Sequence, residues 1–311
     1  MSSVITYLKI YRFGMYAVKP FDPWRSPMCT CPRKYVLHPY TGCGHGCLYC
    51  YASSYIRNFF NPRPKKSLGR ALVKDLGKLP LGTVIEMSTS SDPYTPPEMD
   101  LRISREAIRE ILERGFRLLI TTKSTLVLRD LDILARYRDK VAVAITITTL
   151  DSGVASVLEP GAPHPEERLR AVRKLSEAGV PTLVRLDPIV PYVNDEYSLV
   201  AKLVDRAVSA GALQITSSTY KARADSLKRL LNAFPHVSSK IVEAYRAGER
   251  IGGYLYLDRD RRLEYMKMVR ELTLRAGAAF NTCREGFAEL ASRGFSCDGS
   301  SLIGRGSLFK F

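Results

Sequence analysis

The feature of this sequence that most constrains its fold is a run of three cysteines, Cys43, Cys47 and Cys50. Three thiols so close along a chain are typical of a metal site. A four-iron cluster held by three cysteines keeps one iron without a protein ligand, and that iron can bind a small molecule. Structural zinc sites usually close at four ligands, whereas this run supplies three. The spacing therefore favours an iron–sulfur cluster with an open position, held by one loop.

Apolar, β-prone segments alternate with amphipathic segments through the middle of the chain. They predict strands at 34–40, 83–88, 116–122, 141–148, 182–187 and 213–216. They predict helices at 48–60, 103–113, 126–137, 166–178, 195–210 and 222–234. Such alternation with short links favours parallel strands in one sheet, an α/β fold. The cysteines follow the first strand, so we expect them at the carboxyl edge of the sheet, where β/α barrels carry their catalytic groups.

The two ends of the chain differ from this alternating part. Residues 1–33 are rich in proline and aromatic residues and predict an irregular N-terminal arm that carries Cys29 and Cys31. Residues 34–235 form the expected barrel, and residues 236–311 predict a mostly helical C-terminal extension that carries Cys283 and Cys297. A length of 311 residues is ordinary for one α/β barrel.

Tyr49 directly precedes Cys50, which completes the pattern C-x3-C-x-aromatic-C. This pattern resembles the signature of the radical S-adenosylmethionine (SAM) superfamily. The resemblance implies that Cys43, Cys47 and Cys50 are the catalytic ligands of a [4Fe-4S] cluster, and that its open iron chelates the amino and carboxyl groups of SAM. It also implies that Tyr49 contacts the adenine. The usual core of this superfamily is a partial (β/α)6 barrel of the TIM type, whose lateral opening admits a large substrate.

Further stretches resemble one branch of that superfamily. They lie at 86–98, 122–132, 158–169 and 187–195. Together with the cysteine run they look like the branch related to spore photoproduct lyase, often labelled DNA repair photolyase. Spore photoproduct lyase uses a cysteine as hydrogen donor near the end of its second strand, and Ser88 stands at the matching position here. A serine O–H bond is too strong to replace a thiol, so thymine-dimer reversal by that route is not expected.

Hydroxyl and carboxyl groups gather after the second predicted strand, at Ser90, Ser91 and Asp92. The resemblance implies that residues at this position hold the amino group of SAM. An Asp-Pro turn capped by hydroxyl groups is the alternative interpretation.

Later strand ends supply candidates for the rest of SAM. The resemblance implies that Thr148, or Thr146 in its place, contacts the ribose. It also implies that Arg168 or Arg185 pairs with the SAM carboxylate, because a planar guanidinium group matches a carboxylate in two hydrogen bonds. A surface salt bridge or a phosphate contact is the alternative for each arginine.

Four cysteines remain outside the run: Cys29, Cys31, Cys283 and Cys297. If the two ends of the chain meet, these thiols could bind an auxiliary [4Fe-4S] cluster or a zinc ion. One or two disulfides, or free thiols, are the alternatives. The C-x-C pair of Cys29 and Cys31 is too tight for an easy mutual disulfide but is common in metal hooks.

The chain is strongly basic, with 47 Lys and Arg against 31 Asp and Glu and a net charge of +16. This charge favours a nucleic acid as substrate, and a peptide or a small metabolite is the alternative. Candidate phosphate contacts form a basic rim after the cysteines, which consists of Arg57, Arg63, Lys65, Lys66 and Arg70. No signal segment or membrane-spanning run is seen, so we expect a cytoplasmic protein without a membrane partner. A single glutamine and five asparagines are typical of a thermophilic protein.

The sequence predicts a radical SAM enzyme, either a lyase or a modification enzyme. Such an enzyme cleaves SAM reductively to a 5'-deoxyadenosyl radical, which abstracts hydrogen from a substrate. Its electron donor would be a ferredoxin or a flavodoxin. Two alternatives are an iron–sulfur redox or sensor protein, and a zinc-stabilised nucleic-acid-binding protein, neither of which turns over SAM.

Overall fold

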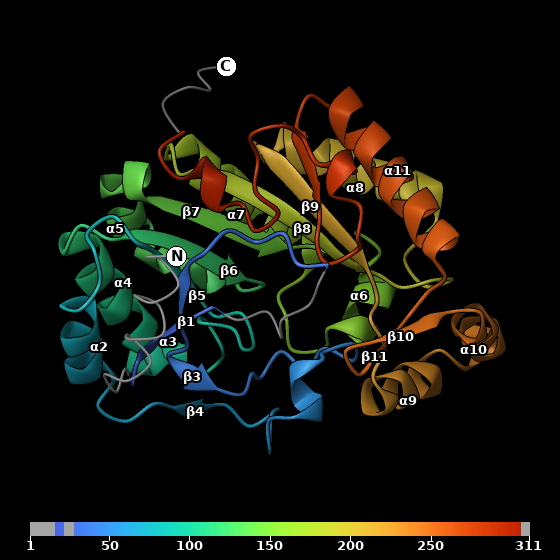
Figure 1. Cartoon of the computed structure of the whole chain (residues 1–311), viewed down its shortest axis with the longest axis horizontal. Helices are drawn as coiled ribbons and strands as arrows, with labels where there is room; N and C mark the ends of the chain where they lie inside the picture. Colours follow the sequence, from blue (N-terminus) through green and yellow to red (C-terminus); the bar gives the residue numbers. More distant parts are fainter. Residues whose placement is uncertain (1–15, 22–27, 306–311) are drawn as a thin grey trace, which may run out of the picture.

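The computed structural model describes residues 16–21 and 28–305, with a curved eight-stranded sheet at its centre (Figure 1). The strand order is β1-β2-β5-β6-β7-β8-β9-β12. β1 (Val18–Pro20) pairs antiparallel with β2, and all other neighbours are parallel. The parallel strands are β2 (Tyr35–Leu37), β5 (Val84–Met87), β6 (Arg117–Thr122), β7 (Val141–Thr146), β8 (Thr182–Ile189), β9 (Gln214–Thr219) and β12 (Ala279–Thr282). The predicted α/β class with a partial barrel is confirmed.

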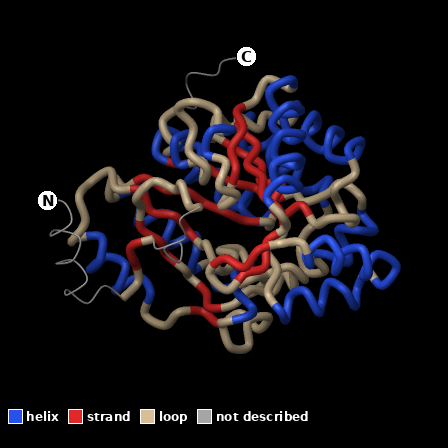
Figure 2. Tube along the Cα trace, turned by 45° about the vertical axis from the view of Figure 1, so that its right-hand side comes forward, coloured by secondary structure: helices blue, strands red, loops and turns tan. Residues whose placement is uncertain are grey.

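Helices line the outside of the curved sheet (Figure 2). They are α2 (Leu68–Leu76), α4 (Ile103–Glu113), α5 (Leu131–Arg136), α7 (Pro165–Glu177), α8 (Tyr197–Ser209) and α11 (Arg259–Arg275). Their apolar faces bury residues such as Ile108, Leu175 and Val204 against the strands, which forms the main core. Because the seven parallel strands all end at one edge, this layer leaves the loops of that edge free to build a site.

Local sequence explains the neighbouring elements β7 and α7. β7 is buried at all of its residues, as its alanine and β-branched composition predicts. α7 begins after His164, whose ring accepts a hydrogen bond from the Glu166 N–H, while Glu167 accepts one from the His164 N–H. Pro165 occupies the first helical position. This cap fixes the connection that leads from α6 (Ser152–Leu158) into α7, beside the cysteine run.

A second helical group lies at one end of the sheet (Figure 1). It contains α9 (Ala224–Ala233), α10 (Ser238–Arg246) and the hairpin of β10 (Glu249–Ile251) and β11 (Tyr254–Tyr256). Its own apolar core includes Tyr220, Leu230 and Tyr245, and it also takes in Leu158 from α6 (Ser152–Leu158). The group is thereby joined to the carboxyl edge of the main sheet.

The C-terminal segment covers the inner face of the sheet (Figure 1). Leu302 packs against Leu119, Ala142 and Leu183, whose side chains come from three neighbouring strands. Gly299 has φ +88°, and a Cβ there would lie 2.6 Å from the Leu183 side chain, so the close approach requires glycine. The extension predicted as mostly helical therefore also contributes strand β12 and an inner plug.

Short elements complete the described residues. They are β3 (Tyr40–Thr41), β4 (Arg63–Pro64), α3 (Glu98–Leu101) and the 3-10 helices η1 (Ala52–Ser54), η2 (Thr125–Asp130), η3 (Arg138–Lys140), η4 (Pro235–Val237), η5 (Ala288–Leu290) and η6 (Ser300–Leu302). No helix among the described residues has the length and apolar character to cross a membrane. Most of the arm predicted for 1–33 lies outside the described residues, and the boundaries predicted at 33 and 235 stay predictions.

The helix predicted for 48–60 is wrong. Only η1 forms there, and most of the segment is turn. The reason is that the segment folds back on the cysteine run, where the Cys43 N–H donates to the Phe59 carbonyl at 2.8 Å. Phe59 and Ala52 then pack in a small apolar cluster with Cys43. Apolar spacing that resembles a helix thus serves the packing of a loop.

Candidate active site at the carboxyl edge of the sheet

The cysteine run forms a loop between β3 and η1. Cys43 and Cys47 are buried, Cys50 is partly buried, and all three are free thiols. Gly42 has φ +87°, and a Cβ there would lie 2.4 Å from the Phe59 carbonyl oxygen. Only glycine allows this close approach of two backbone segments. The loop therefore buries two of the thiols and part of the third within a tightly closed backbone.

The connection between α6 and α7 holds this loop from the other side. The Leu48 N–H donates to the Leu158 carbonyl at 2.9 Å, and the Gly161 N–H donates to the His45 carbonyl at 2.8 Å. The ring of His45 returns a hydrogen bond from Nδ1 to the Gly161 carbonyl at 3.0 Å. A Cβ on Gly161 would lie 2.4 Å from the Gly44 oxygen, so no larger residue fits without moving the loop.

Asp92 ties the same loop to the end of β6. Its carboxylate lies 3.1 Å from His45 Nε2 and accepts hydrogen bonds from the Thr122 hydroxyl at 2.7 Å and the Lys123 N–H at 2.8 Å. Burial raises the pKa of Asp92, but His45 and these hydrogen bonds outweigh it and hold the pKa at about 2. Asp92 is therefore an ionised anchor within the protein, and its predicted contact with the SAM amino group stays a prediction.

Ser90 and Ser91 lie beside Asp92, after β5. The backbone N–H and the hydroxyl of Ser90 both contact His38 Nε2, at 3.2 and 3.1 Å, and Ser91 lies 3.4 Å from the Ser88 hydroxyl. Burial lowers the pKa of His38 to about 4, so its ring is neutral and Nε2 acts as an acceptor. The structure thus brings the predicted serines together at the sheet edge.

Two charged residues that the sequence analysis did not single out surround Tyr49. Its hydroxyl donates to Glu159, which also receives a hydrogen bond from Arg168 at 2.5 Å. Lys123 Nζ lies 5.5 Å from the centre of the Tyr49 ring. Burial raises the pKa of Glu159, but Arg168 and Lys123 outweigh it and lower the pKa. Lys123 and Glu159 lie in the stretches 122–132 and 158–169, which carry the family resemblance. That resemblance is the sequence signal by which these two residues could have been found.

The predicted arginine contacts lie inside the protein. Arg168 is 1% exposed, and beyond Glu159 it bonds the carbonyls of Thr146 and Pro163. Arg185 pairs with Asp187 at 2.6 Å within the barrel. Each arginine thus already pairs with a carboxylate of the protein, and both assignments to the SAM carboxylate stay predictions.

Thr148 is different, because its hydroxyl has an open bonding position. Its Oγ1 is buried and has no hydrogen-bond partner among the described residues. Its backbone is fixed, since the carbonyl accepts a hydrogen bond from Asn194 at 2.8 Å. A buried hydroxyl without a partner is costly unless a ligand satisfies it. The Thr148 hydroxyl fits a contact with SAM, and the three free thiols fit a [4Fe-4S] cluster, the two cofactors that the family resemblance implies.

The four remaining cysteines come from the two ends of the chain and meet. Cys31 Sγ lies 3.2 Å from Cys297 Sγ, and Cys29 is hydrogen-bonded to Cys31. All four are free thiols. Over residues 16–21 and 28–305, no three histidine, cysteine or acidic side chains are already arranged around a position for an ion.

The basic rim lies on the segment that leads to α2. Arg57, Lys66 and Arg70 are exposed. Arg63 instead bonds the carbonyls of residues 57, 58 and 61, which closes the turn. Lys65 is partly buried, and this burial lowers its pKa. Three of the five candidate phosphate contacts are thus free to meet a polyanion.

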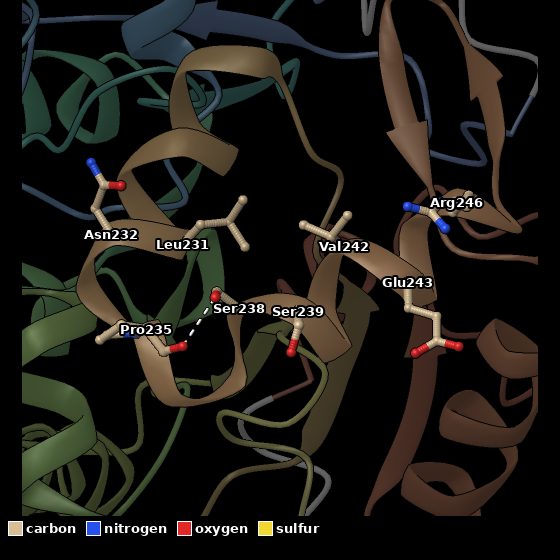
Figure 3. A pocket seen from close by; sticks show the side chains of 8 residues that line it. All are labelled: Leu231, Asn232, Pro235, Ser238, Ser239, Val242, Glu243 and Arg246. Atoms are coloured by element: carbon tan, nitrogen blue, oxygen red, sulfur yellow. Dashed lines mark hydrogen bonds between the residues drawn. The ribbon is translucent and has the colours of Figure 1, made fainter.

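A groove on the outer surface lies between α9 and α10 (Figure 3). Asn232, Ser238 and Arg246 are among its lining residues, and Ser238 donates to the Pro235 carbonyl within it. None of the predicted site residues lines the groove. The chemistry of the cysteine loop is therefore not located there.

Known proteins share this sequence pattern and this fold. The family model of the radical SAM superfamily matches residues 37–204. An uncharacterized protein of Methanocaldococcus jannaschii is 33% identical over 198 residues, which cover 63% of this chain and 72% of that protein. An uncharacterized protein of Acidianus two-tailed virus is 34% identical over 164 residues, which cover 48% of this chain and 54% of that protein. The chain thus spans about half the length of the viral relative.

Solved structures are similar as well. A spore photoproduct lyase variant with bound AdoMet and dinucleoside spore photoproduct has a TM-score of 0.64 at 21% identity, covering 84% of this chain and 79% of that chain. Spore photoproduct lyase complexed with the dinucleoside spore photoproduct also has a TM-score of 0.64, at 20% identity, covering 87% of this chain and 79% of that chain. At this level of identity, the likeness shows a shared fold.

Proposed function

The chain belongs to the radical SAM superfamily, and on that premise we propose that Cys43, Cys47 and Cys50 hold a [4Fe-4S] cluster that binds SAM. The observation that carries the proposal is the loop itself, which holds three free thiols, two buried and one partly buried, at the carboxyl edge of the parallel strands. When bound, the cluster and SAM supply reductive cleavage of SAM and a 5'-deoxyadenosyl radical that takes hydrogen from a substrate.

The residues around the loop position these groups. Glu159, itself held by Arg168, fixes the Tyr49 hydroxyl, which orients the ring that is proposed to contact adenine. The Thr148 hydroxyl is the proposed ribose contact, because its bonding position is open. Burial raises the pKa of Cys47, and the positive charge of Lys123 acts in the opposite direction. Lys123 thereby favours the thiolate form of Cys47.

We propose a nucleic acid as the substrate class. The net charge of +16 and the exposed residues of the basic rim support a polyanion. The dinucleoside bound to the similar lyase structures is consistent with this class. Ser88 is 1% exposed at the end of β5 and carries no thiol, so the proposed reaction is not the reversal of a thymine dimer by a donor at that position.

The experiment begins with anaerobic reconstitution, followed by counts of iron, sulfide and zinc. After reduction with dithionite in place of ferredoxin or flavodoxin, the wild-type protein should convert SAM to 5'-deoxyadenosine, and Cys47→Ala should not. DNA and RNA in deuterated solvent, analysed by mass spectrometry, would then reveal which polymer exchanges or loses hydrogen. An intact cluster without deoxyadenosine would indicate a redox or sensor protein. Zinc in place of iron would indicate a nucleic-acid-binding protein.

A further inference from the structure

The four cysteines outside the loop form one cluster of sulfur atoms, although they are up to 268 positions apart in the sequence. Cys31 and Cys297 are in contact at 3.2 Å, and Cys29 is hydrogen-bonded to Cys31. Cys283 is close enough to Cys31 and Cys297 for the charges of their thiolates to interact. The N-terminal segment before β2 and the C-terminal plug therefore meet through their thiols.

Charged side chains of both signs lie around this cluster. Arg185 is hydrogen-bonded to Cys283. Lys34 is 2% exposed and bonds Asp298, the neighbour of Cys297, at 2.5 Å and Glu86 at 2.6 Å. Cys297 is buried, and the other three cysteines are partly buried. Burial and the carboxylates of Asp187 and Asp298 raise the pKa values of Cys283 and Cys31, respectively, whereas Arg185 lowers the pKa of Cys283 and Lys34 lowers that of Cys31. A centre that binds here would therefore have to supply the positive charge that holds all four thiolates.

We propose that Cys29, Cys31, Cys283 and Cys297 form a second metal site, which takes a thiophilic centre, either an iron–sulfur cluster or zinc. Each thiol releases its proton as the centre binds, and iron with sulfide, or zinc, enters from solution. The set is complete at four sulfur ligands, so this centre has no open position. It is a structural or electron-transfer site rather than a second SAM site.

The sulfur distances describe the protein before the centre binds. A disulfide would hold Cys31 and Cys297 at about 2.05 Å, well below the 3.2 Å observed. Tetrahedral zinc with sulfur at about 2.3 Å would place the ligands about 3.8 Å apart, so the pair must open slightly. Among the described residues, no three histidine, cysteine or acidic side chains already surround an ion position, so binding a centre here requires the cysteine side chains to rearrange.

The site lies where the sheet is open. β2 and β12 belong to opposite ends of the strand order, with the N-terminal segment on one side and the C-terminal segment on the other. Cys31 precedes β2, and Cys283 directly follows β12. A centre bound to both segments would close this seam, which no strand pairing closes. The proposal thus predicts that the metal stabilises the barrel as a whole.

The test uses the full chain with the first site removed. The variant Cys43→Ala, Cys47→Ala, Cys50→Ala is reconstituted anaerobically with iron and sulfide, and separately with zinc, while circular dichroism checks its fold. It should keep about four iron atoms and absorb near 400 nm, or keep about one zinc ion. Adding Cys283→Ser should lower this content at least several-fold, whereas adding Ser296→Ala, which leaves all sulfurs in place, should not.

The outcomes are separable from those of the proposed function. Metal retained by the triple variant supports the second site even if the wild type forms no 5'-deoxyadenosine. A folded triple variant without stoichiometric metal in both reconstitutions overturns the second site, whatever the wild type does with SAM. A Cys31–Cys297 disulfide found by mass spectrometry of unreduced, reconstituted protein overturns it as well.

Discussion

At the scale of single residues, the hydroxyl of Thr148 is a buried group without a partner, so its replacement gives a direct test of cofactor binding. Thr148→Val keeps the shape and removes the hydroxyl. If this group bonds the ribose, the dissociation constant of SAM should rise about fivefold, which corresponds to one lost hydrogen bond of about 1 kcal/mol. The free energy of unfolding without SAM should not fall. Titration calorimetry and urea denaturation measure the two quantities.

Thr149→Val is the matched control for this change. The Thr149 hydroxyl accepts a hydrogen bond from the Asp151 N–H at 3.1 Å, so its loss should lower the free energy of unfolding by about 1 kcal/mol. Its effect on SAM affinity should be small. If both valine variants weaken SAM binding equally, the assignment of Thr148 to the ribose is contradicted.

Asp92 makes the stability of the protein depend on pH. Its pKa in the folded state is about 2, below the ordinary value of 3.8, so its contribution is present above pH 4 and is lost as the pH falls toward 2. Asp92→Asn should reduce the free energy of unfolding by about 2 kcal/mol near neutral pH. The difference from wild type should shrink between pH 4 and pH 2. Urea denaturation of the metal-free protein across that range measures it.

Asp132 supplies the comparison, because it also pairs with a basic residue, here Arg105, but lies in solvent. Its carboxylate is 2.7 Å from Arg105 Nη2 and its side chain is 62% exposed. Solvent screens such a pair, so Asp132→Asn should change the pH profile little. A profile for Asp92→Asn that runs parallel to wild type would mean that His45 does not hold Asp92 ionised.

At the scale of elements, the contact between the cysteine loop and the α6–α7 connection depends on Gly161. An added Cβ would lie 2.4 Å from the Gly44 oxygen and 3.0 Å from the His45 Cα. Gly161→Ala must therefore displace the loop, which should cost about 1–3 kcal/mol of stability and lower the iron bound per chain. Iron and sulfide counts after reconstitution, together with thermal denaturation, would show this effect.

Gly69→Ala in α2 is the control for the same chemical change in open space. No atom lies within 4 Å of the position of its Cβ, and the residue is helical. Alanine there should raise the free energy of unfolding by about 0.5–1 kcal/mol and leave iron loading unchanged. Normal iron loading in Gly161→Ala would show that the loop does not need this close contact.

The elements also show what sequence alone could predict. Local periodicity located the six parallel strands from β2 to β9 and most helices, because burial on one or both faces leaves a repeating pattern, as in β7 and α7. The cysteine loop was predictable since its three cysteines are neighbours in the chain. The hydrogen bond of Tyr49 with Glu159 spans 110 residues, and nothing local encodes it. The apolar spacing of 48–60 predicted a helix, but the segment forms turns because its apolar side chains pack against the cysteine loop.

At the scale of the whole molecule, the ends of the chain contribute more than periodicity could indicate. β12 joins the sheet beside β9, and Leu302 packs against its inner face. The metal-ligand types of Cys29 and Cys297 were visible in the sequence, but their meeting depends on the complete barrel. Lys34 and Asp298 form a buried ion pair across the same junction. Contacts at this junction therefore link the start of the predicted barrel to the predicted C-terminal extension.

The net charge of +16 belongs to the whole molecule, and its distribution decides whether the basic rim is a binding surface. Arg57→Ala, Lys66→Ala and Arg70→Ala together remove three exposed charges from that rim. If each meets a phosphate, the slope of log K against log salt for duplex DNA should become shallower by about three, since each contact contributes about 0.9. Fluorescence anisotropy at several salt concentrations measures the slope.

A second triple variant separates the basic rim from total charge. Arg170→Ala, Arg173→Ala and Lys174→Ala remove three exposed charges from α7, in the outer helical layer. Total charge changes equally in the two variants, so diffuse attraction predicts equal losses of affinity. Direct phosphate contacts predict a shallower slope only for the variant of the basic rim. Equal slopes in both variants would mean that a bound nucleic acid does not follow the segment from Arg57 to Arg70. The substrate would then have to reach the cysteine loop across another face of the protein.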